Sequence, residues 1–145
     1  MAEVASPTRP GHSKRATRTK ARKRAVDILF ESELRGLDPL STLNVRTEDA
    51  DPPVREFTAE LVRGICEHRV EIDRRIGEHL ASGWTLPRIP RVDRAVLRMA
   101  VYEIGWTEVP PKVAVAEAVS LVEDLSTDDS PKFVNGVLGS VLGED

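Results

Sequence analysis

The residues with the clearest chemical capacity are the cationic side chains near the start of the chain. Residues 1–24 carry eight lysines and arginines and one acid, a net charge of +7, whereas the other residues together carry −10. Arg15, Arg18 and Arg22 are spaced three and four residues apart and would align on one helix face. Guanidinium groups form paired hydrogen bonds with phosphates. The segment therefore predicts an anionic polymer as ligand, with a solvated, disordered tail as the competing interpretation.

Several other classes of function find no support. His68 and His79 are too far apart to share a metal, because eleven residues of helix span about 16 Å. Cys66, the single cysteine, is interpreted as a buried structural residue. The sequence contains no glycine-rich phosphate loop or nucleophile elbow, no membrane-length apolar run and no signal peptide. We expect a cytoplasmic protein with no catalytic residues, no metal and no cofactor.

The elements that position the basic residues are predicted from composition and spacing. Residues 1–18, rich in Ser, Pro, Thr, Gly and basic side chains, are predicted to be a disordered basic arm. Apolar residues at helical spacing then predict a first helix from about Thr19, which Gly36 ends. Part of the basic cluster would thus lie on the first turns of a helix, whose N-terminus adds partial positive charge.

The remainder of the chain, within a single domain at 19–145, also shows helical periodicity. A long amphipathic helix is expected from Pro53 to about Ala81, with Gly64 as the candidate point of interruption. Further helical segments are predicted after Pro90, Pro111 and Ser130. No segment alternates apolar and polar residues as a half-buried strand does. The predicted fold class is all-α, with about six helices.

The last predicted helix contains a local conflict. Asn135–Gly136 ordinarily indicates a tight hairpin turn, and glycine costs a helix interior roughly 1 kcal/mol relative to alanine. The start signal at Ser130 favours the helix, and Gly136 is then expected to allow another helix to approach closely. Phe133 lies in the first turn beside Lys132, where its ring is either partly exposed or part of the core.

Four motifs follow one another in the C-terminal half of the chain: VDRAVLRMAVYE at 92–103, VPPKVA at 109–114, EAV at 117–119 and DSPKFVNGVL at 129–138. Their order, and above all the run KFVNGVL, resembles the bacterial NusB family of transcription antitermination factors. The basic start of the first helix extends the likeness to most of the chain. The resemblance implies a compact all-helical fold of six to seven helices, arranged as two three-helix units.

The resemblance also implies a function without catalysis. Members of the family bind the boxA element of nascent ribosomal RNA transcripts together with the small-subunit ribosomal protein that doubles as NusE. The pair helps to assemble a complex in which RNA polymerase reads through terminators, and some members self-associate. We therefore expect RNA, the ribosomal protein and the polymerase complex as partners, with a homodimer left open and no membrane association.

Site residues follow from the charge pattern and the resemblance. The RNA-facing candidates are Arg15, Arg18, Lys20, Arg22, Lys23, Asp129, Lys132 and Phe133. The resemblance places Phe30 and Asp93 at positions that face the ribosomal-protein partner. Residues 130–138 would mainly brace the RNA site.

Two alternative functions compete with this one. The first is the RNA-binding domain of a ribosomal-RNA cytosine methyltransferase, whose N-terminal domain resembles NusB. Such enzymes need a nucleotide-binding α/β domain and a cysteine nucleophile, and we expect neither because the sequence stops soon after its last helix. The second is a scaffold that binds only protein through acidic helices, and it would show no gain in binding when boxA RNA is added.

Overall fold

The computed structural model describes residues 10–49 and 53–143, with side chains from residue 16 onward. Within these ranges the chain forms helices and no β-strand. The elements are α1 (Pro10–Arg35), α2 (Pro39–Asp49), α3 (Glu56–Glu67), α4 (Arg69–Glu78), the 3-10 turn η1 (Leu86–Arg88), α5 (Arg91–Trp106), α6 (Pro111–Leu125) and α7 (Ser130–Gly143). The predicted all-α class is confirmed.

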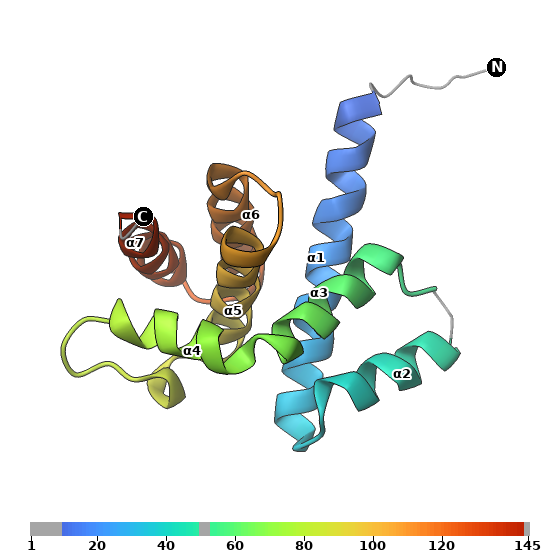
Figure 1. The fold of residues 1–145 in the computed structure, drawn as a ribbon, viewed down its shortest axis with the longest axis horizontal. Helices are drawn as coiled ribbons and strands as arrows, with labels where there is room; N and C mark the ends of the chain where they lie inside the picture. Colours follow the sequence, from blue (N-terminus) through green and yellow to red (C-terminus); the bar gives the residue numbers. More distant parts are fainter. Residues whose placement is uncertain (1–9, 50–52, 144–145) are drawn as a thin grey trace.

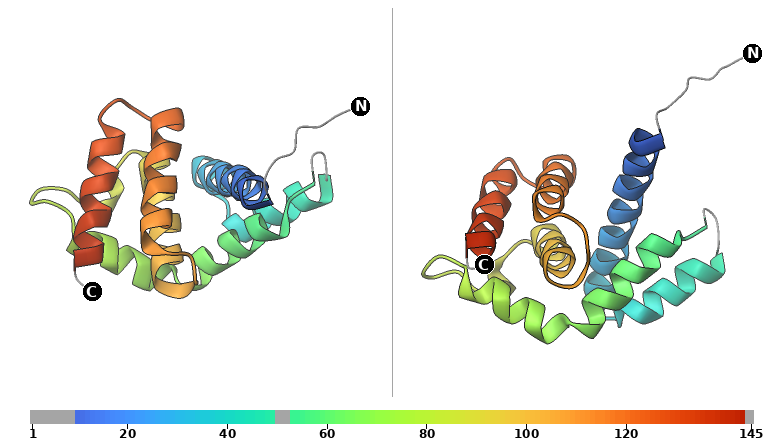
Figure 2. Two further views of the ribbon diagram at one scale, coloured as in Figure 1. Left: turned by 90° about the horizontal axis from the view of Figure 1, so that it is seen from above. Right: turned by 45° about the horizontal axis from the view of Figure 1, so that its top comes forward.

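The helices form two groups of three, as the family resemblance implies (Figure 1). Helices α1, α2 and α3 contact one another, and so do α5, α6 and α7. Helix α4 follows α3 and packs on α5 and α7, so it joins the two groups. Helix α5 also packs on α1 and α3. In all three views α5 and α6 lie between α1 and α7 (Figure 2).

Helix α1 is longer than its apolar spacing predicts. It begins at Pro10, so residues 10–18, which were assigned to the disordered arm, are helical in the structure, while residues 1–9 lie outside the described part. Alanine, lysine and arginine favour helix, and extending an existing helix costs less than nucleating a new one. The predicted stop is confirmed, because Gly36 has a φ of 67° and the next amide donates to the Ser32 carbonyl at 2.8 Å.

The long helix predicted after Pro53 is two helices, and the break falls at His68 rather than at Gly64. The His68 backbone leaves helical geometry (φ −107°, ψ 17°), and its ring stacks on Trp106 with centroids 4.6 Å apart. Gly64 is buried within α3, where a Cβ atom would overlap the Tyr102 ring of α5. Gly64 is therefore the point of close helix approach that the sequence assigned to Gly136.

The conflict at Asn135–Gly136 is resolved in favour of helix, since α7 continues through both residues. The expected close approach at Gly136 is wrong, because that residue is exposed and a Cβ there would meet nothing within 4 Å. The buried stripe of α7 consists of Val134, Val137, Leu138 and Val141. It joins a single core to which all seven helices contribute.

Candidate nucleic-acid interface

Three exposed cations of α1 lie at residues 18–23, towards the N-terminal end of that helix, while Arg35 is exposed in its last turn. Arg18, Lys20 and Lys23 are exposed. Arg15 also lies within α1, but its side chain is outside the described part. Because α1 begins at Pro10, Arg18, Lys20 and Lys23 lie beyond its first turn, where the partial positive charge of a helix N-terminus has faded, so their own charges carry this surface. This end of α1 is therefore a strongly cationic surface.

A shallow cavity of about 390 Å³ lies beside this surface, between α1 and the residues before α3. Lys20, Lys23, Arg24 and Arg55 contribute four positive charges to its lining, whereas Asp27 contributes one negative charge. Sequence reasoning missed Arg55, since nothing in its neighbours connects it with a helix thirty residues earlier. The net charge of the lining suits an anion such as a phosphate.

A larger groove of about 750 Å³ lies on another side of α1, where α3 and the turn into α6 form its walls. The Arg18 guanidinium lies 5.0 Å from the Phe57 ring centre, in a cation–π contact. Arg22 and Lys112 bring the cations in the walls to three, and Glu60, Glu108 and Glu117 supply three carboxylates. The groove is of mixed charge, and Arg18 lines it without lining the smaller cavity. Phe57 belongs to the amphipathic segment after Pro53, whose apolar spacing gives no sign of a contact with Arg18.

Arg22 does not face solvent, which corrects the prediction that it contacts RNA. Its side chain is 3% exposed, and two of its nitrogens, Nε and Nη2, each donate to the Glu103 carboxylate of α5 at 2.9 Å. Its Nη1 lies 3.3 Å from Glu117 of α6. Arg22 shares the face of α1 that carries the buried Ala21 and Ala25, so the packing of α5 and α6 decides its role. It ties α1 to the other three-helix group.

A second group of predicted residues lies at the start of α7. Asp129 and Lys132 are exposed, and Phe133 is half-buried. The Phe133 ring lies against Trp84 from the loop after α4, with centroids 5.7 Å apart. Trp84 is 44% exposed, so this pair presents aromatic surface beside a lysine. Sequence reasoning did not identify Trp84, because the loop that carries it lies far from α7 along the chain.

Asp93 is buried, which corrects its assignment to a partner-binding surface. Its carboxylate is 2% exposed and accepts hydrogen bonds from the Ser126 hydroxyl at 2.5 Å and the Ser130 hydroxyl at 2.8 Å. These bonds anchor both ends of the loop between α6 and α7 to the start of α5. Asp93 thus positions the α7 start that carries Lys132. Phe30 is half-exposed on α1 and remains available to a partner.

The structure does not bring the two groups of RNA candidates into one cluster. The α1 group and the α7 group lie on opposite sides of α5 and α6 (Figure 2). Helices α5 and α6 lie between α1 and α7 (Figure 2), and a helix with its side chains is about 10 Å across. A single nucleotide could not contact both groups, whereas an extended strand could.

The described residues give little support to metal binding, to a cysteine nucleophile or to a membrane-spanning helix. Among them no group of three His, Cys, Asp or Glu side chains could hold a metal ion. Burial raises the pKa of the Cys66 thiol, and the Asp38 carboxylate acts in the same direction. A raised thiol pKa lowers the thiolate fraction that a nucleophile needs. No helix in the described ranges is long and apolar enough to cross a membrane.

The fold and these surfaces define a class: an all-helical binding protein with a cationic helix end for an anionic ligand. The chain belongs to the NusB family, whose model matches residues 19–142. It is similar to the transcription antitermination protein NusB of Acidothermus cellulolyticus, with 58% identity over 125 residues and 86% of each chain covered. The NusB protein of Saccharopolyspora erythraea is 57% identical over 129 residues, which cover 87% of this chain and 86% of the relative.

Solved structures agree with this assignment. NusB of T. maritima superposes with a TM-score of 0.76 at 31% identity, covering 88% of this chain and 91% of that one. A chain from the crystal structure of antitermination factors NusB and NusE in complex with dsRNA superposes with a TM-score of 0.77 at 29% identity. The match covers 88% of this chain and 97% of that chain.

Proposed function

We propose that this chain is a non-catalytic transcription antitermination factor that binds the boxA element of ribosomal RNA transcripts together with the NusE-type ribosomal protein. The observation that carries the proposal is the superposition on a chain from a complex of NusB and NusE with RNA, at a TM-score of 0.77. The pair would act in the cytoplasm, within the complex that lets RNA polymerase pass terminators.

The cationic end of α1 supports RNA as the ligand. Arg18, Lys20 and Lys23 are exposed there, and Arg55 adds a further cation from the segment before α3. Neutralising three phosphates of a single strand gives a slope of log affinity against log salt of about −2. The basic arm is proposed at residues 1–18, before the domain at 19–145, and its cations other than Arg18 would add further phosphate contacts.

The start of α7 supports base recognition. Phe133 and Trp84 offer aromatic surface on which an unpaired base can stack, and Lys132 is exposed beside them. Stacking on a protein ring contributes about 1–3 kcal/mol per base. Because α5 and α6 separate this group from α1, the RNA must be extended to reach both, as a single-stranded element can be.

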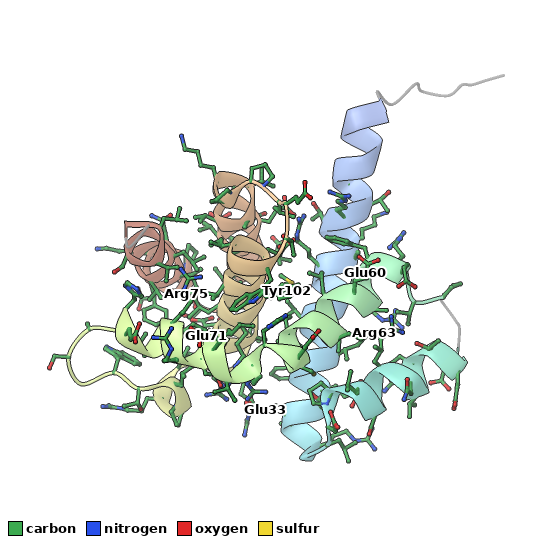
Figure 3. The ribbon with its side chains drawn as sticks, viewed as in Figure 1. Glu33, Glu60, Arg63, Glu71, Arg75 and Tyr102 are labelled. Atoms are coloured by element: carbon green, nitrogen blue, oxygen red, sulfur yellow. The ribbon has the colours of Figure 1, made fainter. Side chains whose placement is uncertain are left out.

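The proposal is tested by titrating labelled boxA RNA with the full chain at two salt concentrations, with and without the NusE-type protein. We expect tighter binding when the partner is present. Arg18→Ala should make the salt slope less steep by about 0.7, because one phosphate contact is lost. The matched control is Arg63→Ala, an exposed arginine on α3 (Figure 3) that lines none of the cavities described above.

Two results would contradict the proposal. Equal affinity for boxA RNA and for a scrambled RNA, with no gain from the partner, would favour the protein-only scaffold. Equal salt slopes for Arg18→Ala and the unmodified chain would remove the α1 end from the interface. Sedimentation of the free chain decides separately whether it is a monomer or a homodimer.

A further inference from the structure

Three aromatic side chains meet where the end of α3 packs against the second half of α5. Tyr102 and Trp106 lie one turn apart on α5, and His68 stands at the break between α3 and α4. The centre of the His68 ring lies 4.6 Å from that of Trp106 and 6.1 Å from that of Tyr102. The three ring planes lie within 23° of one another. All three side chains are half-buried, so the cluster presents partly exposed rings of nearly one orientation.

Two carboxylates flank this aromatic cluster. Glu60, Gly64 and Glu67 are four and three residues apart, so they share one face of α3. The Tyr102 ring lies over Gly64, where a Cβ atom would come within 2.1 Å of it. Both glutamates are exposed, one turn to either side of that point. Burial raises the pKa of the Tyr102 hydroxyl, and the charges of Glu60 and Glu67 act in the same direction. The rings and the two glutamates thus form one aromatic–acidic surface.

Neither glutamate is neutralised by a lysine or arginine within the described part of the chain. Glu60 has no ion-pair partner there, and Glu67 approaches only Nε2 of His68, at 4.0 Å. Arg63, which lies between them on α3, pairs with Glu56 instead. The aromatic–acidic surface therefore keeps two negative charges beside its rings.

One guanidinium group already lies at the edge of this surface. Nη1 of Arg75, from α4, would lie 3.1 Å from a Cβ atom at Gly105, the residue before Trp106. In the view of Figure 3, Arg75 lies on one side of Tyr102 and Glu60 on the other. A cation from a ligand would therefore approach Tyr102 from the Glu60 side.

The arrangement of the rings selects the kind of cation. A rounded ammonium group is best bound by rings that face it from several sides, and these rings are nearly parallel. A guanidinium group is planar, stacks on aromatic faces and donates paired hydrogen bonds to carboxylates, whereas the ammonium of lysine is a compact, strongly hydrated charge. The surface therefore favours arginine over lysine, and its negative charges disfavour a phosphate backbone.

We propose that the aromatic–acidic surface binds an arginine side chain from a basic segment of a protein partner. The guanidinium stacks on exposed ring surface of Tyr102 or Trp106, and Glu60 or Glu67 accepts its N–H groups. Complementary charge attracts the basic segment and repels RNA. Trp106 lies thirteen residues beyond Asp93 on α5, which is about 20 Å of helix. This surface is thus at the opposite end of α5 from the start of that helix, and it goes beyond the proposed binding of boxA RNA and the NusE-type protein.

Nuclear magnetic resonance of the full chain tests the proposal, because its two tryptophans give two indole N–H signals. The probe is a short blocked peptide of alternating glycine and arginine, compared with the same peptide containing lysine. The Trp106 signal should move and saturate with the arginine peptide. Trp84, on the loop after α4, is the internal control, and its signal should stay in place. We expect the lysine peptide to bind roughly threefold more weakly.

Substitutions separate the aromatic and acidic contributions. Tyr102→Leu should weaken binding of the arginine peptide about two- to fivefold, the range for an exposed cation–π contact, whereas Tyr102→Phe keeps the ring and should retain the affinity. Glu60→Gln combined with Glu67→Gln should weaken binding roughly threefold or more. The matched control combines Glu48→Gln with Glu123→Gln, which alters the net charge equally at exposed positions of α2 and α6, and it should leave the affinity unchanged.

Thermal unfolding of each variant separates a lost contact from lost folding, and the two surface glutamates provide a test that does not depend on the packing of Tyr102. Equal affinity for the arginine and lysine peptides overturns the inference, as does an equal loss in the glutamate pair and its control. If single-stranded oligouridine moves the Trp106 signal and the arginine peptide does not, the surface belongs to RNA and the inference is wrong. A Trp106 signal that moves with the concentration of the chain alone would assign the surface to a second copy instead. None of these outcomes alters the proposed function, which the boxA titration tests separately.

Discussion

Replacing Arg22 decides whether that residue is a structural ion pair or an RNA contact. In Arg22→Met the aliphatic stem is retained and the guanidinium is removed, which leaves the Glu103 carboxylate, 1% exposed, without its charged partner. Removing one member of a buried ion pair costs about 3–5 kcal/mol. The total free energy of unfolding of a domain is about 5–15 kcal/mol. The substitution should therefore cost a large part of the stability.

The assay is urea unfolding followed by circular dichroism, with the RNA titration performed on the same samples. Arg18→Met is the matched control, because Arg18 is exposed on the same helix and contacts only the Phe57 ring among the described side chains. We expect that control to change the free energy of unfolding by no more than about 0.5 kcal/mol. It should instead reduce the salt slope of RNA binding by about 0.7.

A compensating variant shows whether the loss arises from the unpaired carboxylate. Arg22→Met combined with Glu103→Met replaces the pair by apolar side chains and should recover the part of the stability that the unpaired Glu103 costs, whereas Glu117 stays without its guanidinium partner. The reasoning is refuted if Arg22→Met unfolds like the unmodified chain and binds RNA more weakly. In that case the guanidinium would leave Glu103 to contact RNA, and the original sequence prediction would be right.

Three further predictions concern packing and pH. Gly64→Ala should lower the free energy of unfolding by about 1–3 kcal/mol, because its Cβ would overlap the Tyr102 ring. Removing that ring as well should restore part of the lost stability in thermal unfolding. Unchanged stability of the single variant would contradict the close packing. Asp93→Ala should cost about 1–3 kcal/mol, measured by urea unfolding, because the hydroxyls of Ser126 and Ser130 lose their hydrogen bonds to a buried carboxylate. Full stability with lost partner binding would place Asp93 in the interface instead. The hydrogen bond from Arg46 lowers the pKa of Glu31, so its stabilising effect is present at neutral pH and disappears as the pH falls through that lowered value. Glu31→Gln should therefore lose at most about 1 kcal/mol at pH 7 and nothing in strong acid, and a difference that persists in acid would refute the ion pair.

Helix α1 carries two different surfaces at its two ends. The N-terminal end presents exposed cations that suit phosphates, and the C-terminal end meets an arginine-lined cavity with aliphatic surroundings. The ion pair of Arg22 with Glu103 fixes the helix between them against α5.

Local features of the chain were predictable from the sequence. The helical class, the stop of α1 at Gly36 and the helical course of residues 130–143 all depend on neighbouring residues and their spacing. Features that depend on contacts with distant parts of the chain were predicted wrongly. The break between α3 and α4 falls at His68, whose ring stacks on Trp106 of α5, a residue far away in the chain.

The sequence by itself determined the helical class, the end of α1 at Gly36 and the unequal distribution of charge, because backbone propensity and side-chain periodicity act over a few residues. Only the tertiary structure decided which charges are available to a ligand. Arg18 and Arg22 are one helical turn apart and look alike in the sequence. Arg22 is buried because Glu103, 81 residues later in the chain, packs over it. The spacing of neighbouring residues cannot predict an ion pair with a residue that far away.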